Sequence, residues 1–246
     1  MSTMRNGTES AMEDNGLNPA AVQESLLDAA LAHVPFDGWS EATFQAAARD
    51  AGVDLPLARV ICPRGAVDLV VAWHRRGDAA MRLRLAQHDL AALRFRERVA
   101  LAVRLRLGAA DRELVRRAAA LFALPQHAGT GSRLIWGTAD AIWEALGDSA
   151  DDLNWYSKRA TLAAVLSATV LYWLGDSSEG DAATWEFLDR RIENVMQIEK
   201  LKAQVQDNRV LRTVFAGPMW LAGKVKAPGS RAEDLPGQTR TEEPAA

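Results

Sequence analysis

Apolar side chains recur every three or four positions along most of the chain, with polar and charged residues between them. Positions at this spacing share one face of an α-helix. Alternating β-branched runs of strand length are absent from the sequence, and nearly every segment is rich in Ala, Leu, Arg and Glu, which favour helix. The pattern therefore predicts an all-α protein of about ten helices.

Proline and glycine clusters predict where these helices end. Asp111, Asp152 and Asp181 are expected to cap helix starts, since a short side-chain oxygen can accept hydrogen bonds from free first-turn amides. The clusters expected to separate helices include Pro35–Gly38, Pro63–Gly65, Pro125–Gly131 and Gly147–Asp152.

Composition along the chain suggests five segments. Residues 1–16 and 227–246 are polar and rich in charge, Pro, Gly and Ser, which predicts disorder. Residues 17–65 have a helix-turn-helix rhythm and form a predicted N-terminal unit. Residues 66–207 are expected to form a larger helical bundle, and residues 208–226 a separate amphipathic helix.

The N-terminal unit is predicted to contain three short helices. Leu26, Leu27, Ala30 and Leu31 mark the apolar face of the first helix. The second helix is expected from Ser40 to Ala51 and the third from Leu55 to Ile61, with Gly52 in the turn, where a positive φ favours glycine. The order ESLLDAAL…ATFQAAARDAGVDLPLARVICPRGA is similar to the N-terminal domain of TetR-type repressors.

The third helix lacks the chemistry of a DNA reader. A recognition helix needs side chains that reach base edges and phosphates. Leu55–Ile61 offers one basic residue, Arg59, and no amide or hydroxyl, while Asp50 and Asp54 would repel the phosphate backbone. We therefore expect no specific nucleic acid partner, and the three-helix unit to serve as a packing module.

Composition narrows the function further. The chain has 246 residues and a net charge of −3, with one cysteine and four histidines, which excludes a disulfide framework and a cysteine-built zinc site. No apolar stretch is long enough to span a bilayer. The N-terminus lacks the pattern of a secretory signal, so we expect a cytoplasmic protein. Residues 64–117 and 200–231 are net basic and 135–199 net acidic, which fits either solvated helix faces or anionic partners.

Two motifs in the C-terminal half are the most specific part of the sequence. Residues 152–169 read DLNWYSKRATLAAVLSAT and residues 184–196 read TWEFLDRRIENVM. Together they resemble an accessory family of ubiquinone (coenzyme Q) biosynthesis, the ninth in the COQ naming series, whose members are lipid-binding relatives of TetR repressors. The resemblance covers roughly residues 20–200, and LPLARVICPRGAVDLV resembles the family's apolar version of the third helix. A mitochondrial presequence is not recognisable, so the chain resembles a bacterial member.

The resemblance implies a non-enzymatic protein without a cofactor. It implies a TetR-like homodimer in which residues 66–207 bind an isoprenoid or quinone-type lipid, and which supports a membrane-associated di-iron hydroxylase. Adjacent helical residues diverge by about 100°, so we expect either Trp155 or Tyr156 to be exposed; the alternative is one core and one half-buried ring. The docking residues implied by the family motif are Asp152, Asn154, Trp155, Tyr156, Lys158 and Arg159.

A lipid cavity is also compatible with the composition of the bundle. Large apolar residues stand among many alanines, which can leave space between helices, although such stripes are more often a filled core. The residues expected to line the cavity are Leu121, Phe122, Leu134, Ile135, Trp136, Trp143, Leu162, Leu166 and Thr169.

Residues 208–226 have the character of a helix that lies in a membrane interface. Apolar residues follow helical spacing, cations flank them, and Pro218 is expected to kink the helix. The alternative is a terminal helix packed on the protein's own body. The residues expected to contact the inner face of the cytoplasmic membrane are Arg209, Leu211, Arg212, Val214, Phe215, Met219, Trp220, Leu221 and Lys224.

Catalytic signatures are missing from the sequence. No histidine follows a glutamate at the Glu-x-x-His spacing of a di-iron site, and no HExxH, GxSxG or P-loop pattern occurs. The leading hypothesis, which the resemblance implies, is an accessory protein that holds a polyprenylated quinone intermediate and presents it to the hydroxylase. The alternatives are a ligand-responsive repressor of TetR type and a lipid-modifying enzyme.

Overall fold

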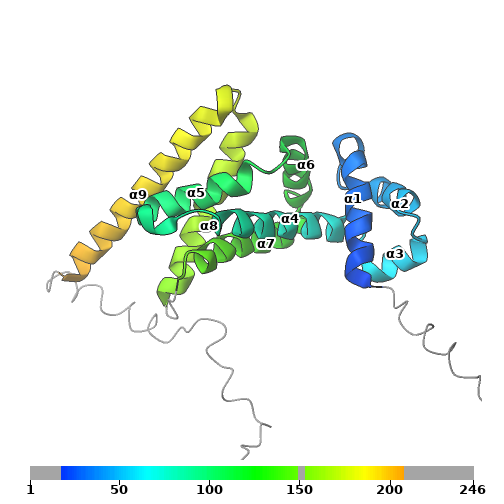
Figure 1. Ribbon diagram of the computed structural model, residues 1–246, viewed down its shortest axis with the longest axis horizontal. Coiled ribbons are helices and arrows are strands. Elements are labelled where there is room, and N and C mark those ends of the chain that lie inside the picture. Colours follow the sequence, from blue (N-terminus) through cyan, green and yellow to red (C-terminus); the bar gives the residue numbers. More distant parts are fainter. Residues whose placement is uncertain (1–17, 149–152, 208–246) are drawn as a thin grey trace, which may run out of the picture. The chain divides into compact units, whose positions relative to one another are not determined.

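The computed structural model describes residues 18–148 and 153–207 (Figure 1). Every regular element in these ranges is helical, which confirms the predicted all-α fold. The predicted tails 1–16 and 227–246 and the predicted membrane helix 208–226 lie outside the described residues. The described α-helices are α1 (Pro19–Asp37), α2 (Glu41–Asp50), α3 (Leu55–Ile61), α4 (Ala66–Leu85), α5 (Phe95–Leu107), α6 (Arg112–Phe122), α7 (Pro125–Ala145), α8 (Leu153–Gly175) and α9 (Ala182–Asp207), with short 3₁₀ turns η1 (Leu90–Ala92) and η2 (Glu179–Asp181).

The chain divides into two compact units, each with its own apolar core. Within the described residues, unit 1 contains residues 18–76 together with Asp111–Ala128, and unit 2 contains Gly77–Ala110 together with residues 129–148 and 153–207. The predicted N-terminal unit ended at residue 65, whereas unit 1 also includes the start of α4 and all of α6. α6 joins it because Leu114 and Ala118 pack in the core of unit 1.

Unit 1 contains the three predicted helices. The Ser40 hydroxyl accepts a hydrogen bond from the Thr43 amide at 3.2 Å and caps α2. Phe44 on α2 is fully buried, and Gly52 turns the chain toward α3 with a φ of +64°. The indole of Trp39 donates a hydrogen bond to the carbonyl of Leu114 at 3.4 Å, which ties α6 to this core. Local sequence pattern and long-range packing thus agree in unit 1.

In unit 2, α9 packs on both α8 and α5. The core of unit 2 contains Met81, Leu85, Val103, Ile142 and Leu188. A buried ion pair adds to this apolar packing.

The buried pair in unit 2 joins α4 to α5 and α7. Arg106 Nε lies 2.6 Å from Asp78 Oδ1, and both side chains are largely buried. The Thr138 hydroxyl donates to the same carboxylate oxygen at 2.9 Å. Breaking such a pair by removing one partner leaves an uncompensated buried charge, so these three residues fix how the helices of unit 2 align.

Two predicted helix breaks each contain a helix boundary, but part of each proline and glycine cluster lies inside a helix. α1 continues through Pro35 to Asp37 because a proline in the last turn disrupts little of a helix that Leu26, Leu27, Ala30 and Val34 anchor in the core. α7 begins at Pro125 and runs through the Gly129–Gly131 segment. Proline suits the first helical position, where no amide donor is needed, and the buried second half of α7 outweighs the glycine cost of about 1 kcal/mol each.

The predicted caps have mixed outcomes. The Asp111 carboxylate accepts a hydrogen bond from the Leu114 amide at 3.0 Å, which confirms it as the cap of α6. At the start of α9, Asp176 accepts from the Thr184 amide at 2.9 Å and Ser178 from the Ala183 amide at 3.0 Å, so first-turn amides bond to residues upstream of Asp181. Asp152 lies outside the described residues.

Candidate functional site

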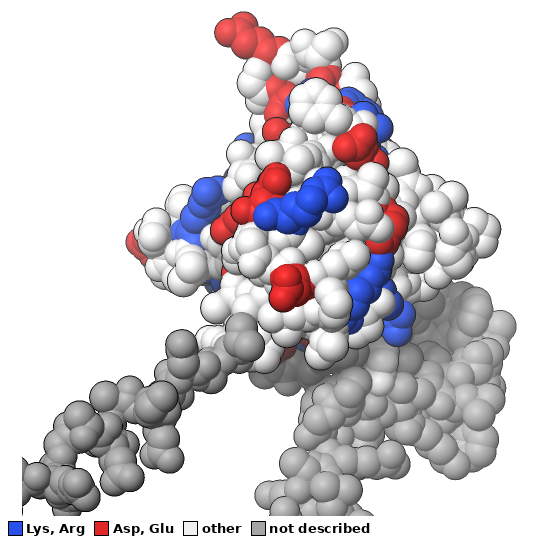
Figure 2. Space-filling view, turned by 90° about the vertical axis from the view of Figure 1, so that its right-hand side faces the viewer, with Lys and Arg blue, Asp and Glu red and all other residues white. Residues whose placement is uncertain are grey.

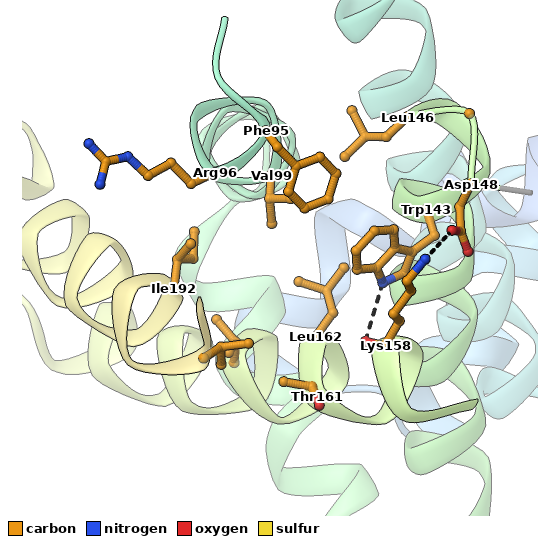
Figure 3. A pocket seen from close by; sticks show the side chains of 13 residues that line it. Phe95, Arg96, Val99, Trp143, Leu146, Asp148, Lys158, Thr161, Leu162 and Ile192 are labelled. Carbon is orange, nitrogen blue, oxygen red and sulfur yellow. Dashed lines mark hydrogen bonds and ion pairs between the residues drawn. The ribbon is translucent and has the colours of Figure 1, made fainter. Parts of the chain in front are cut away.

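Unit 2 contains a cavity of about 440 Å³ between α5, α8, α9 and the end of α7 (Figure 3). This volume is within the range of about 300–1,000 Å³ typical of small-molecule sites. The lining is mainly apolar, with rings contributed by α5 and α7 and branched aliphatic side chains by α8 and α9. The apolar lining residues are Phe95, Val99, Trp143, Leu146, Leu162, Val165, Ile192 and Val195.

The position of the large rings explains why space remains. Phe95, the first residue of α5, stacks on Trp143 of α7 with ring centroids 5.5 Å apart. The ring pair bridges two helices, while shorter side chains such as Val165 and Val195 line the cavity from α8 and α9. Helices held apart by rings and lined by shorter side chains leave an apolar space that can accept an apolar molecule.

One end of the cavity carries an ion pair (Figure 3). Lys158 Nζ lies 2.6 Å from Asp148 Oδ1 and 5.2 Å from the centre of the Trp143 ring. The Trp143 indole donates a hydrogen bond to the Lys158 carbonyl at 3.2 Å, so side chain and backbone of Lys158 are both held. Burial raises the pKa of Asp148, but hydrogen bonds and charge from Lys158 and Arg159 outweigh it and keep that pKa below its ordinary value. Asp148 therefore stays ionised at neutral pH.

Arg159 completes this network from the interior side. Its side chain is only 3% exposed and bonds to Asp140 and, at 3.1 Å, to Asp148 Oδ2. The guanidinium also lies over the Trp155 ring, 3.9 Å from its centre. Asp148 thus binds a cation that lines the cavity and a second cation that supports an aromatic cluster.

The aromatic cluster consists of Trp136 from α7 and Trp155 and Tyr156 from α8. The rings of Trp155 and Tyr156 meet edge to face at 4.8 Å, and Trp136 lies 6.1 Å from the first and 6.4 Å from the second. Both α8 rings are half-buried. The expectation that one of the two rings is exposed is wrong, because both rings pack against Trp136 of α7.

The other residues implied for docking are placed differently. Asp152 and the side chain of Asn154 lie outside the described residues. Lys158 faces the cavity, and Arg159 is buried beneath Trp155. The structure therefore leaves Trp155 and Tyr156 as the described members of this set that can offer ring surface to a partner.

The residues expected to line a lipid cavity separate into several groups. Trp143 and Leu162 line the observed cavity of unit 2. Leu166 and Ile135 pack in the core of unit 2, and Trp136 belongs to the aromatic cluster. Leu134 and Thr169 are buried outside the lining, whereas Leu121 and Phe122 pack against the core of unit 1.

Sequence reasoning missed the parts of the cavity contributed by α5 and by the ion pair. Phe95 and Val99 follow Arg94 in a segment rich in arginine, where charge conceals the apolar face. Ile192 and Val195 stand on a clear apolar stripe of α9. Periodicity shows that such residues face inward, but it cannot show which of them border a space.

The third helix of unit 1, α3, presents apolar side chains and one paired cation. Arg59, the one cation of α3, bonds to Glu41 and lies over Phe44, 4.5 Å from the ring centre. α3 exposes Val60 and Leu55. In the uncovered part of Figure 2, basic and acidic residues are interspersed and form no continuous basic surface.

Among the described helices, none is both long and apolar enough to cross a bilayer.

Residues 128–199 match the COQ9 family. The resemblance to this family is thereby confirmed. The matched range holds α8, the aromatic cluster, the ion network and most of the cavity lining; Phe95, Arg96 and Val99 lie before it.

The chain is similar to proteins named "Ubiquinone biosynthesis protein COQ9, mitochondrial". The identity is 31% with the Drosophila melanogaster protein, over 81% of this chain and 64% of the relative, and 30% with that of Rattus norvegicus, over 75% and 62%. The human protein is 28% identical over 75% and 61%. The chain thus spans somewhat less than two thirds of the length of these relatives.

A solved structure supports the predicted fold. A TetR transcriptional regulator from Nitrosomonas europaea superimposes with a TM-score of 0.57, covering 70% of this chain and 97% of the regulator, at 21% identity. This likeness confirms the TetR-like fold, and at that identity it bears on the fold alone.

Proposed function

We propose that this chain is a non-enzymatic accessory protein of ubiquinone biosynthesis that holds a polyprenylated quinone intermediate in the cavity of unit 2. The observation that carries the proposal is the coincidence of two features: an apolar cavity of ligand size, and a match to the COQ9 family over the helices that form most of it. Relatives with ubiquinone biosynthesis in their names supply the biological process.

The physical task of such a protein is to shield a prenyl chain from water. Moving hydrocarbon out of an apolar environment costs roughly 0.8 kcal/mol for each CH₂ group. A cavity lined by Val99, Leu162, Val165 and Ile192 lowers this cost for the part of the chain that it encloses. The protein therefore needs to bind the lipid and release it, without reacting with it.

We propose that Trp155 and Tyr156 form the docking surface for a membrane-associated di-iron hydroxylase. Half-buried aromatic rings held by a neighbouring ring and a cation are preorganised, so little conformational entropy is lost on binding. This proposal is supported by the ion network, in which Asp148 binds both Lys158, which lines the cavity, and Arg159, which lies over the Trp155 ring. A lipid could then pass to the partner over a short path.

Residues 208–226, outside the described range, are proposed to hold the protein on the inner face of the membrane. Each cation near an anionic leaflet contributes roughly 1 kcal/mol to binding. Deletion of 208–226 should release the full chain from anionic liposomes in a flotation assay, while neutral liposomes serve as the control. Unchanged flotation would place membrane binding elsewhere in the chain.

We also propose a homodimer. Leu171 on α8 is 68% exposed, and its neighbour Tyr172 stacks on Phe187 of α9 with ring centroids 4.5 Å apart. Exposed apolar side chains at the contact of two helices are suited to burial against a second copy. Light scattering after size exclusion should give twice the monomer mass, and Leu171→Glu should reduce it to the monomer value. A monomeric wild type would overturn this proposal.

The lipid-binding proposal is tested by mass spectrometry of lipid that co-purifies with the protein. Val165→Phe should fill the cavity and reduce the bound isoprenoid several-fold, because Val165 lines it. Val170→Phe on the same helix lies outside the lining and is the matched control. Purified protein that carries no lipid and takes none up, or equal lipid in both variants, would contradict the proposal. Sequence-specific nanomolar binding to genomic DNA would instead favour the repressor.

A further inference from the structure

The cavity is chemically asymmetric, and Lys158 stands at its polar end. The cations that line it are Arg96 and Lys158. Arg96 bonds to Glu193 at 3.1 Å, and in Figure 3 its side chain extends away from the aromatic rings. Lys158 lies beside Trp143 and Asp148, across the cavity from Ile192 (Figure 3). An amphiphile can therefore place its apolar part among the aliphatic side chains and its head at Lys158.

Lys158 has hydrogen-bonding capacity to offer such a head. An ammonium group carries three donors, and Asp148 Oδ1, at 2.6 Å, occupies one of them. The side chain of Lys158 is 29% exposed and lies against the Trp143 ring, so its charge is partly desolvated. Hydrogen bonds from a charged donor in such surroundings are stronger than those between neutral groups.

The charges around Lys158 already balance. Asp148 and Asp140 bind Lys158 and Arg159, which gives two carboxylates and two cations. A neutral head leaves this balance intact and needs only an acceptor oxygen. An anionic head would add an uncompensated charge and compete for Lys158 with Asp148, which is only 6% exposed and would lose one of its two cations.

We propose that Lys158 is the specificity-determining residue of the cavity: its ammonium binds an oxygen of a neutral head group, and its pairing with Asp148 disfavours an anionic head. This inference rests on the proposed lipid-binding function and goes beyond it by assigning the selection of the head to one ion pair. Asp148 acts as a positioning residue, because it holds the ammonium beside Trp143.

The test compares three probes with the same short prenyl tail: a prenylated benzoquinone, the hydrocarbon without a head, and the prenyl carboxylic acid. Isothermal titration calorimetry with the full chain measures each dissociation constant. The wild type should bind the quinone about tenfold more tightly than the hydrocarbon, since a factor of ten corresponds to one hydrogen bond from a charged donor. The carboxylic acid should bind less tightly than the quinone.

Variants separate the head contact from general effects. Lys158→Met keeps the length of the side chain and should reduce quinone affinity to that of the hydrocarbon, with hydrocarbon affinity within about twofold of wild type. Lys158→Arg should restore the preference for the quinone. Arg96→Met, which removes the other lining cation, should leave the preference unchanged. Circular dichroism confirms that each variant is folded.

The outcomes separate the inference from the function on which it rests. Equal affinity of the wild type for quinone and hydrocarbon, an unchanged preference in Lys158→Met, or tightest binding of the carboxylic acid would each overturn the role of Lys158 while lipid binding stands. Failure of the wild type to bind any of the three probes would overturn the proposed function as well.

Discussion

The two units of this chain use their cations in opposite ways. In unit 1, Arg59 sits on the helix that would read DNA in a repressor, and it is bound to Glu41 on the neighbouring helix. In unit 2, Lys158 and Arg159 meet Asp148 beside an apolar cavity. A helix-turn-helix shape needs only its buried face to persist, so the outer face of α3 can become apolar, with Val60 76% exposed, without loss of the fold.

Burial makes these ion pairs energetically different. The Arg59 and Glu41 side chains are 37% and 52% exposed, whereas those of Arg159 and Asp148 are 3% and 6% exposed. Exposed pairs contribute little because water screens both charges, while a buried charge that loses its partner is costly. The same type of interaction is therefore dispensable in unit 1 and structural in unit 2.

Arg159→Met should have the largest effect on stability. It leaves Asp140 and Asp148 without their shared cation and removes the guanidinium from the Trp155 ring. We expect a loss of about 3 kcal/mol or more in the free energy of unfolding, measured by urea denaturation. A loss of unfolding free energy below about 1 kcal/mol would show that water solvates the Arg159 ion pairs. It would also contradict the proposed difference in energy between the ion pairs of the two units.

Trp155→Lys should weaken capture of the di-iron hydroxylase by roughly 30-fold, as expected for an interface anchor worth about 2 kcal/mol. The measurement is a titrated pull-down, with circular dichroism to confirm the helical fold. Val60→Lys on α3 is the control in unit 1, because it removes an exposed apolar side chain far from the motif in sequence. Undiminished capture by Trp155→Lys, or equal loss in both variants, would refute the docking assignment.

Asp148 should give the protein a stability that depends on pH. Its pKa is lowered in the folded protein from an ordinary value of 3.8, so its ionised form stabilises the fold fully above that value. The stability difference between wild type and Asp148→Asn should therefore be constant near neutral pH and shrink below about pH 4, as protonation reaches the lowered pKa.

Urea unfolding at a series of pH values measures this dependence. Asp28→Asn in unit 1 removes a carboxylate that is 67% exposed and 2.7 Å from Arg76, and it serves as the matched control. The free energy of unfolding of Asp28→Asn should stay close to that of the wild type at every pH in the series. A difference for Asp148→Asn that does not change with pH would contradict the ion-pair origin of the effect.

Arg59→Met should have the smallest effect. Its ion pair with Glu41 is exposed, so the free energy of unfolding should change by less than about 1 kcal/mol. Affinity for DNA, measured by gel shift at low salt, should remain nonspecific and unchanged. A marked loss of DNA binding in Arg59→Met would indicate that α3 contacts DNA and would contradict this expectation.

The sequence alone determined the helical class and the helices of unit 1. The apolar period, the Ser40 cap and the Gly52 turn are local features, and local features govern where a helix begins and ends. The motif at residues 152–169 also predicted the resemblance to the COQ9 family, because its residue pattern is specific without any knowledge of packing.

The tertiary structure alone decided where space remains and which charges meet. Phe95 and Trp143 are 48 positions apart in the sequence, yet their rings stack and separate two helices. Asp148 pairs with two cations that sequence reasoning had placed on the surface. A helical period shows that a side chain faces inward, but volume and charge pairing depend on what the opposite helix presents, and only the folded chain fixes that partner.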